Sequence, residues 1–90
     1  PEEHDVCVAA TSHVPHLVAS LLAASTPEDV LDCVANGWKD STRVAAGDVE
    51  MWRQIVCENR AAAVARLDRF LAAADSMRQS LASGDDEVWV

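Results

Sequence analysis

The chain has 90 residues, a mass of 9.7 kDa and a formal net charge of −8, from 7 Lys and Arg against 15 Asp and Glu. This length allows one domain with a small core. An acidic chain repels phosphates, so the charge argues against nucleic acids and anionic membranes as partners. The three glycines lie too far apart for a GxGxxG or P-loop motif. This chain alone therefore lacks either of these nucleotide-binding loops.

The cysteines Cys7, Cys33 and Cys57 form no CxxC pair and are odd in number. This usage argues against a disulfide framework and favours a reducing, cytoplasmic location. No uninterrupted apolar run reaches the roughly 20 residues that span a bilayer, and the acidic N-terminus lacks a signal-peptide pattern. Because the sequence has no initiator Met and opens on patterned residues, we expect it to be part of a longer protein.

Strand patterns are nearly absent and alanine is abundant, which predicts an all-α fold. The first expected helix covers residues 2–24. One face of it carries apolar residues and a histidine at helical spacing, namely Val6, Ala10, His13, Leu17 and Leu21. Because proline removes a backbone donor and clashes with the preceding turn, Pro15 predicts a kink or break at residues 12–15.

The middle of the chain is expected to hold short helices. Thr26 before Pro27 predicts a helix start with Thr26 as the N-cap. We expect this helix to end near residues 36–37, where a glycine allows a left-handed backbone. Residues 38–40 are predicted as a loop and residues 41–46 as a short helix.

The stretch from Asp48, a predicted N-cap, to about residue 83 is the most periodic part of the chain. From residue 59 onward a helix would be roughly 37 Å long. Its apolar stripe, which predicts packing against another chain, consists of Val64, Leu67, Leu71, Ala74, Met77 and Leu81. With Gly84 as the stop, we expect a helical bundle with a long C-terminal helix over residues 1–84 and an acidic tail over residues 85–90.

All three histidines lie near the N-terminus, where His4, His13 and His16 surround Cys7. These residue types could bind zinc. However, they are expected on one helical segment, and a single helix cannot surround a tetrahedral ion. The alternative is a set of packed or surface histidines, which we favour, so we expect no metal.

A second cluster lies at residues 36–43, where Lys39 and Arg43 are the only Lys or Arg before Arg53. In so acidic a chain this segment is the natural place for an anion, because arginine can bind a carboxylate through two parallel hydrogen bonds. The alternative interpretation is a surface loop in which Asp40 pairs with Arg43. By itself, Trp52 is read as a core residue.

Three motifs in order resemble the prephenate dehydrogenase family. The first is Thr11 to Ala19, with the pattern SHxPHxxA, and the second is Gly37 to Ala45, close to GFxDxTRIA but with Trp38 in place of Phe. The third is Asp48 to Ile55 followed by Asn59, close to DPxMWxDI and Asn. The resemblance covers about residues 1–83.

The resemblance implies that this chain is the helical C-terminal domain of a two-domain enzyme. The N-terminal Rossmann domain, which would bind NAD or NADP and supply the main catalytic histidine, is not in this sequence. The implied reaction is the oxidative decarboxylation of prephenate in tyrosine biosynthesis, and the implied assembly is a homodimer through the helical domain. We expect no turnover from this chain alone, and no catalytic residue within it.

The resemblance also assigns substrate-binding residues. Arg43 matches the arginine that holds a substrate carboxylate, and His4 and His16 match histidines that line the pocket. Trp52 and the backbone next to Gly37 match positions that approach the site from the neighbouring subunit. Lys39 and Asp40 are supporting residues, with Asp40 orienting Arg43. His13 is expected to cap or pack instead.

The sequence leaves several alternatives open. Arogenate is an alternative substrate, and the residues do not choose between NAD and NADP or decide whether tyrosine inhibits. A related dehydrogenase acting on another acid is a further alternative. A helical module that only binds or dimerises, without catalysis, is the alternative from a different functional class.

Overall fold

The structure is a computed structural model that describes residues 2–85, and these form helices and connections with no strand among them. The order is α1 (Glu2–Val8), a π-helical segment (Ala9–His13), α2 (Val14–Ser25), a 3₁₀ segment (Glu28–Cys33), α3 (Asn36–Thr42), a 3₁₀ segment (Arg43–Ala46), α4 (Val49–Glu58) and α5 (Arg60–Ser83). The predicted all-α fold and the long C-terminal helix are confirmed. The predicted tail over residues 85–90 lies, after Asp85, outside the described residues.

The first three elements make one continuous helix from Glu2 to Ser25. The sequence predicted a kink or break near Pro15, but the helix continues through this residue. Instead the π-helical turn Ala9–His13 comes just before it. A π-turn adds a residue to the winding, which lets the chain pass a proline that lacks an amide hydrogen. The helix therefore carries His13 and His16 on one continuous support.

This N-terminal helix is long and apolar enough, with a mean hydropathy of 1.5, to pass a test for membrane spans that counts only length and composition. The sequence contains no uninterrupted apolar run of this length, so the sequence alone did not predict a membrane span. In the fold, one face of the helix is buried against other elements, including Ala9, His13, Val14, His16 and Ala19. Of its most apolar stretch 28% is buried, and core helices and signal sequences pass the same test.

The middle of the chain differs from the prediction. Thr26 is the C-cap of α2 and not an N-cap, and residues 36–40, expected to end one helix and form a loop, begin α3. The reason is tertiary: the Trp38 indole N–H donates to the Thr26 hydroxyl at 2.8 Å, and that hydroxyl donates to the Leu22 carbonyl at 2.7 Å. These bonds hold α3 against the end of α2.

The later boundaries follow the prediction closely. The Asp48 carboxylate accepts the Met51 amide at 3.0 Å and so caps α4, as expected for an N-cap aspartate. Gly84 ends α5 in the left-handed region at φ 79°, where glycine carries no steric penalty. Asn59, at φ −121° and ψ 35°, separates α4 from α5.

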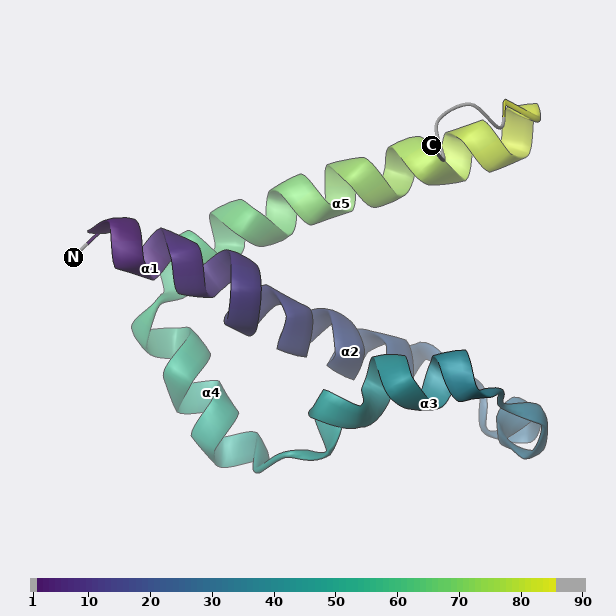
Figure 1. Ribbon diagram of the computed structural model, residues 1–90, viewed down its shortest axis with the longest axis horizontal. Helices are drawn as coiled ribbons and strands as arrows, with labels where there is room; N and C mark the ends of the chain where they lie inside the picture. Colours follow the sequence, from purple (N-terminus) through teal and green to yellow (C-terminus); the bar gives the residue numbers. More distant parts are fainter. Residues whose placement is uncertain (1, 86–90) are drawn as a thin grey trace.

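The helices spread out from a junction near the N-terminus. Figure 1 shows α4 and α5 meeting beside α1 and then diverging on either side of α2, with α3 packed along the far end of α2. The radius of gyration is 15.1 Å, against about 12 Å for a compact chain of this length. The buried apolar residues are few and mostly small, namely Ala9, Val14, Ala19 and Ala63. The chain therefore has little core of its own.

Candidate functional site

The most defined side-chain contact lies between α2 and α4. The rings of His16 and Trp52 are stacked, with centroids 4.0 Å apart and planes 9° from parallel. His16 is only 8% exposed, and its Nδ1 is buried without a hydrogen-bond partner in the described part of the chain. Because a buried polar atom without a partner costs free energy, this nitrogen is a candidate for contact with a ligand.

The stack forms one wall of a cavity of about 660 Å³ between α2 and α4. Its lining is mainly apolar, with Leu17, Ala45 and Val49 among its residues, and Arg53 and Cys57 lie at its α4 side. This is within the usual size range of small-molecule sites. A mainly apolar wall with one aromatic stack fits an apolar or ring-shaped ligand group.

Gly47 allows the indole of Trp52 to lie where it does. A Cβ added at Gly47 would be 3.1 Å from Nε1 of Trp52 and 3.3 Å from Cδ1, closer than side chains normally pack. The backbone of Gly47 is extended, at φ −73° and ψ 178°, a conformation that any residue adopts. The lack of a Cβ at Gly47 therefore leaves space for the indole.

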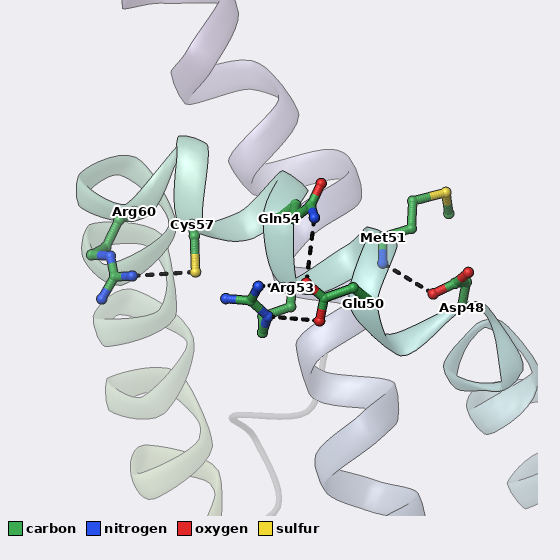
Figure 2. A network of polar contacts seen from close by, with 7 residues as sticks. All are labelled: Asp48, Glu50, Met51, Arg53, Gln54, Cys57 and Arg60. Atoms are coloured by element: carbon green, nitrogen blue, oxygen red, sulfur yellow. Dashed lines mark hydrogen bonds and ion pairs between the residues drawn. The ribbon is translucent and has the colours of Figure 1, made fainter.

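A chain of polar contacts along α4 borders the cavity (Figure 2). The Arg53 Nε donates to Glu50 at 3.0 Å, and Arg60 donates to the Cys57 sulfur at 3.2 Å. The Arg53 guanidinium, and secondarily the Gln54 amide, hold the pKa of the Glu50 carboxyl below its usual range, and Glu50 raises the pKa of Arg53 in return. Since both side chains are exposed, this pair orients Arg53 more than it stabilises the fold.

The predicted cationic segment lies apart from this cavity. Arg43 begins the 3₁₀ segment after α3, and Lys39 lies within α3; both are exposed. The ion pairs between residues 2 and 85 do not include one between Asp40 and Arg43, so the local pairing offered as an alternative does not form, and neither does the orienting contact expected of Asp40. Gly37 is exposed in α3, with open space around it.

The histidines take three different positions. His16 lines the cavity, His13 is buried and contacts Asn59, and His4 is exposed on α1. The packing of His13 agrees with the structural role expected for it. Within residues 2–85, no three His, Cys, Asp or Glu side chains converge to form a metal-ion site. The structure thus brings His16 and Trp52 together, and leaves His4, Gly37, Lys39 and Arg43 separate from them.

The apolar stripe of α5 is largely exposed. Val64 is 52% exposed, Leu71 54% and Leu81 59%, and Phe70 and Met77 are also exposed. A run of large apolar residues along a 24-residue helix is a surface that soluble chains cover with a partner. Fold and surface together define a helical association domain that also carries a small-molecule cavity.

Comparison with known proteins agrees with this class. The whole chain, residues 1–90, matches the family described as "Prephenate dehydrogenase, dimerization domain". The chain therefore belongs to the prephenate dehydrogenase family, as its dimerization domain. The resemblance drawn from the three motifs is confirmed.

The relatives carry matching names. The chain is 35% identical to a cyclohexadienyl dehydrogenase of Zymomonas mobilis, over 96% of this chain and 32% of that protein. It is 34% identical to a prephenate dehydrogenase of Bacillus subtilis, over 97% of this chain and 25% of that protein. A prephenate dehydrogenase of Lactococcus lactis is 27% identical over 97% of this chain and 26% of its own length. The chain spans about a third or a quarter of the length of these relatives.

Proposed function

We propose that this chain is the helical C-terminal domain of an NAD(P)-dependent prephenate dehydrogenase of tyrosine biosynthesis. The observation that carries the proposal is the family match over the entire chain together with two relatives at 35% and 34% identity that are named as dehydrogenases. The reaction is oxidative decarboxylation. A hydride leaves the ring carbon that bears the hydroxyl, carbon dioxide leaves from the opposite carbon, and the ring becomes the phenol of 4-hydroxyphenylpyruvate.

The residues of this chain suit the binding of that substrate. Prephenate is a dianion with a six-membered ring, and the exposed Arg43 and Lys39 offer cations in a chain of net charge −8. Within residues 2–85 Arg43 has no ion pair, and an arginine can form a bidentate contact with a substrate carboxylate. The stacked His16 and Trp52 offer an apolar wall for the ring. His4 and the backbone at Gly37 are the remaining proposed contacts.

The cofactor is proposed to bind elsewhere in the enzyme. The glycines Gly37, Gly47 and Gly84 form no phosphate-binding loop, so the residues present here do not fit a nicotinamide dinucleotide. We assign NAD or NADP to a Rossmann domain preceding this chain, and expect this chain alone to be inactive. With three free cysteines, a cytoplasmic location fits the proposal.

A homodimer through the exposed α5 stripe is the proposed assembly. The family description as a dimerization domain supports it, as does the small core within one chain. In such a dimer, residues of one copy that remain exposed here, including those of the cationic segment, can complete a site built on the other copy.

Arogenate is the second candidate substrate. The relative named cyclohexadienyl dehydrogenase favours keeping it, because both acids carry a cyclohexadienyl ring and differ in the side chain, a keto acid in prephenate and an amino acid in arogenate. A module that dimerises without catalysis is the alternative of another class, and it predicts no turnover of either substrate.

The test is a steady-state assay of the full-length protein with prephenate and arogenate, each with NAD and with NADP. Reduction of the nicotinamide together with release of carbon dioxide supports the proposal, and the ratio of kcat/KM values assigns the substrate and the cofactor. A folded, dimeric protein that turns over neither acid would overturn the proposal and leave the non-catalytic module and a dehydrogenase for another acid as the alternatives.

The role of Arg43 is tested in the same assay. We expect Arg43→Ala to raise KM by about 30- to 1,000-fold, since losing a bidentate charged contact costs on the order of 2–4 kcal/mol. Arg43→Lys keeps the charge but not the paired geometry, so it should recover only part of the loss. An unchanged KM for Arg43→Ala would remove Arg43 from the site.

A further inference from the structure

Asn59 joins two helices at the junction from which the helices diverge. Its backbone N–H donates to the Val56 carbonyl at 3.0 Å, and its carbonyl accepts the Ala63 N–H at 2.9 Å. Asn59 therefore ends α4 and begins the hydrogen bonding of α5. At φ −121° and ψ 35° it also sets the angle between the two helices.

The side chain of the same residue reaches the N-terminal helix. Its Nδ2 donates to the Asp5 carbonyl at 2.8 Å and lies 3.2 Å from Nδ1 of His13. The amide must be oriented with nitrogen on this side, because the opposite orientation would place Oδ1 against the Asp5 carbonyl oxygen. The amide group then has one hydrogen for each of these two acceptors.

This arrangement specifies the tautomer of His13. Since Nδ2 of Asn59 can only donate, Nδ1 of His13 must accept, and the ring carries its proton on Nε2. His13 is 7% exposed, so the contact is sheltered from water. The charged residues that line the surface hollow beside Asn59 are Glu2, Asp5, Glu58 and Arg60.

The junction lies next to the candidate site along both helices. His13 comes three residues before His16, and Asn59 comes seven residues after Trp52. The 660 Å³ cavity lies between α4 and α2, and a smaller one of about 170 Å³ lies where α4 and α5 meet Leu17 of α2. The Asn59 contacts and the His16–Trp52 stack therefore hold α4 at its two ends, with open space between them.

We propose that Asn59 is a positioning residue, whose amide fixes the end of α4 so that Trp52 stacks on His16. No shorter, longer or charged side chain reproduces this contact. Aspartate cannot donate to the two acceptors, and glutamine is one methylene too long for the same place. The kinetic part of this proposal rests on the proposed function, whereas the placement of Trp52 does not.

The first test needs no substitution near the site. A two-bond ¹H–¹⁵N correlation spectrum of the His13 ring in the full-length protein is expected to show Nε2 protonated and Nδ1 unprotonated. His13→Phe identifies the signals by their loss. The opposite tautomer in the wild-type protein would overturn the proposal even if every Asn59 variant failed to fold.

The second test measures the placement of Trp52. The Trp52 emission is measured in the full-length protein as the difference between each protein and the same protein with Trp52→Phe. Asn59→Ala is expected to shift this emission towards that of a solvated indole. Gln54→Ala is the matched control, because it removes an amide from the same helix that bonds only to Glu50. Equal emission in Asn59→Ala and Gln54→Ala would contradict the proposal.

The third test separates binding from chemistry. We expect Asn59→Ala to raise KM about 10-fold or more while kcat changes less than about twofold, since misplacing a binding wall weakens a contact made alike in the ground and transition states. His13→Phe should raise KM in the same way. An unchanged KM in an active Asn59→Ala enzyme would overturn the proposal. If the wild-type protein has no activity, the emission and tautomer results stand alone, and the proposed function fails instead.

Discussion

Two regions of this domain present apolar surface in different ways. Between α2 and α4, specific contacts place each group: the His16–Trp52 stack, the close approach at Gly47 and the bonds of Asn59. Along α5, a regular stripe of apolar residues lies exposed without such contacts. The difference is that the first surface is shaped by contacts within one chain, whereas the second lies exposed in one chain, as a surface of a dimerization domain can.

The largest expected effect concerns α5. Leu71→Glu places a charge in the middle of the exposed stripe, where Leu71 is 54% exposed in one chain. If this stripe is the dimer interface, burying the charge should weaken dimerisation by roughly 100-fold or more. Analytical ultracentrifugation of the full-length protein over a range of concentrations measures this change.

Ser76→Glu is the control for that experiment, because Ser76 is an exposed polar residue of the same helix outside the stripe. We expect it to leave the dimer intact. If both variants dimerise as the wild type does, α5 is not the interface, and the contrast between the two regions loses its basis.

A smaller effect is expected at Gly47. Gly47→Ala adds a Cβ 3.1 Å from Trp52 Nε1, so the indole must shift by a few tenths of an ångström in its place against His16. Such overpacking costs about 1–3 kcal/mol, and chemical denaturation with Trp52 emission as the probe measures it. Dimerisation is expected to stay unchanged, because Gly47 precedes α4 and is not part of α5.

Gly37→Ala is the matched control, since open space surrounds Gly37 within α3. Alanine in a helix is favoured over glycine by about 0.5–1 kcal/mol, so this variant should be neutral or slightly more stable. A loss of stability at Gly37 equal to that at Gly47 would show that the space beside Trp52 is not the cause.

The smallest effect is expected at Glu50. The Arg53 guanidinium lowers the pKa of the folded Glu50 carboxyl. The contribution of the pair to stability is therefore present above the carboxyl pKa of the unfolded chain and is lost as the pH falls through the lower pKa of the folded state. Thermal scans should show Glu50→Gln slightly less stable than the wild type at about pH 7, with the difference vanishing at about pH 3.

Local sequence predicted the helix boundaries at Asp48 and Gly84 correctly, but it did not predict the helices in the middle of the chain. Asp48 and Gly84 act through their own backbone neighbours, so their roles as caps were predictable. Thr26 could cap either a following or a preceding helix, and the choice depended on the indole of Trp38, 12 residues away. The prediction was wrong there because a long-range hydrogen bond outweighed a local preference.

The candidate site shows the same division. The motifs indicated His16 as a pocket residue and Trp52 as one that approaches the site from the neighbouring subunit, whereas the structure stacks the two rings within one chain. The role of Asn59 could not be predicted from spacing, because the imidazole of His13 that it contacts lies 46 residues earlier in the chain. The role of Gly47 could not be predicted either, because it depends on where the indole of Trp52 lies in the fold. Arg43 and Lys39 remain predictions, since their proposed partner is a substrate.

By itself the sequence determined the helical class, the family, the caps at Asp48 and Gly84, and the apolar stripe of α5, because each depends on residue type and short-range spacing. Only the tertiary structure decided that Pro15 follows a π-turn within an unbroken helix, that α3 begins at Asn36, and that Asn59 links α4 to His13. These features depend on which side chains meet across helices, and helical periodicity carries no information about that.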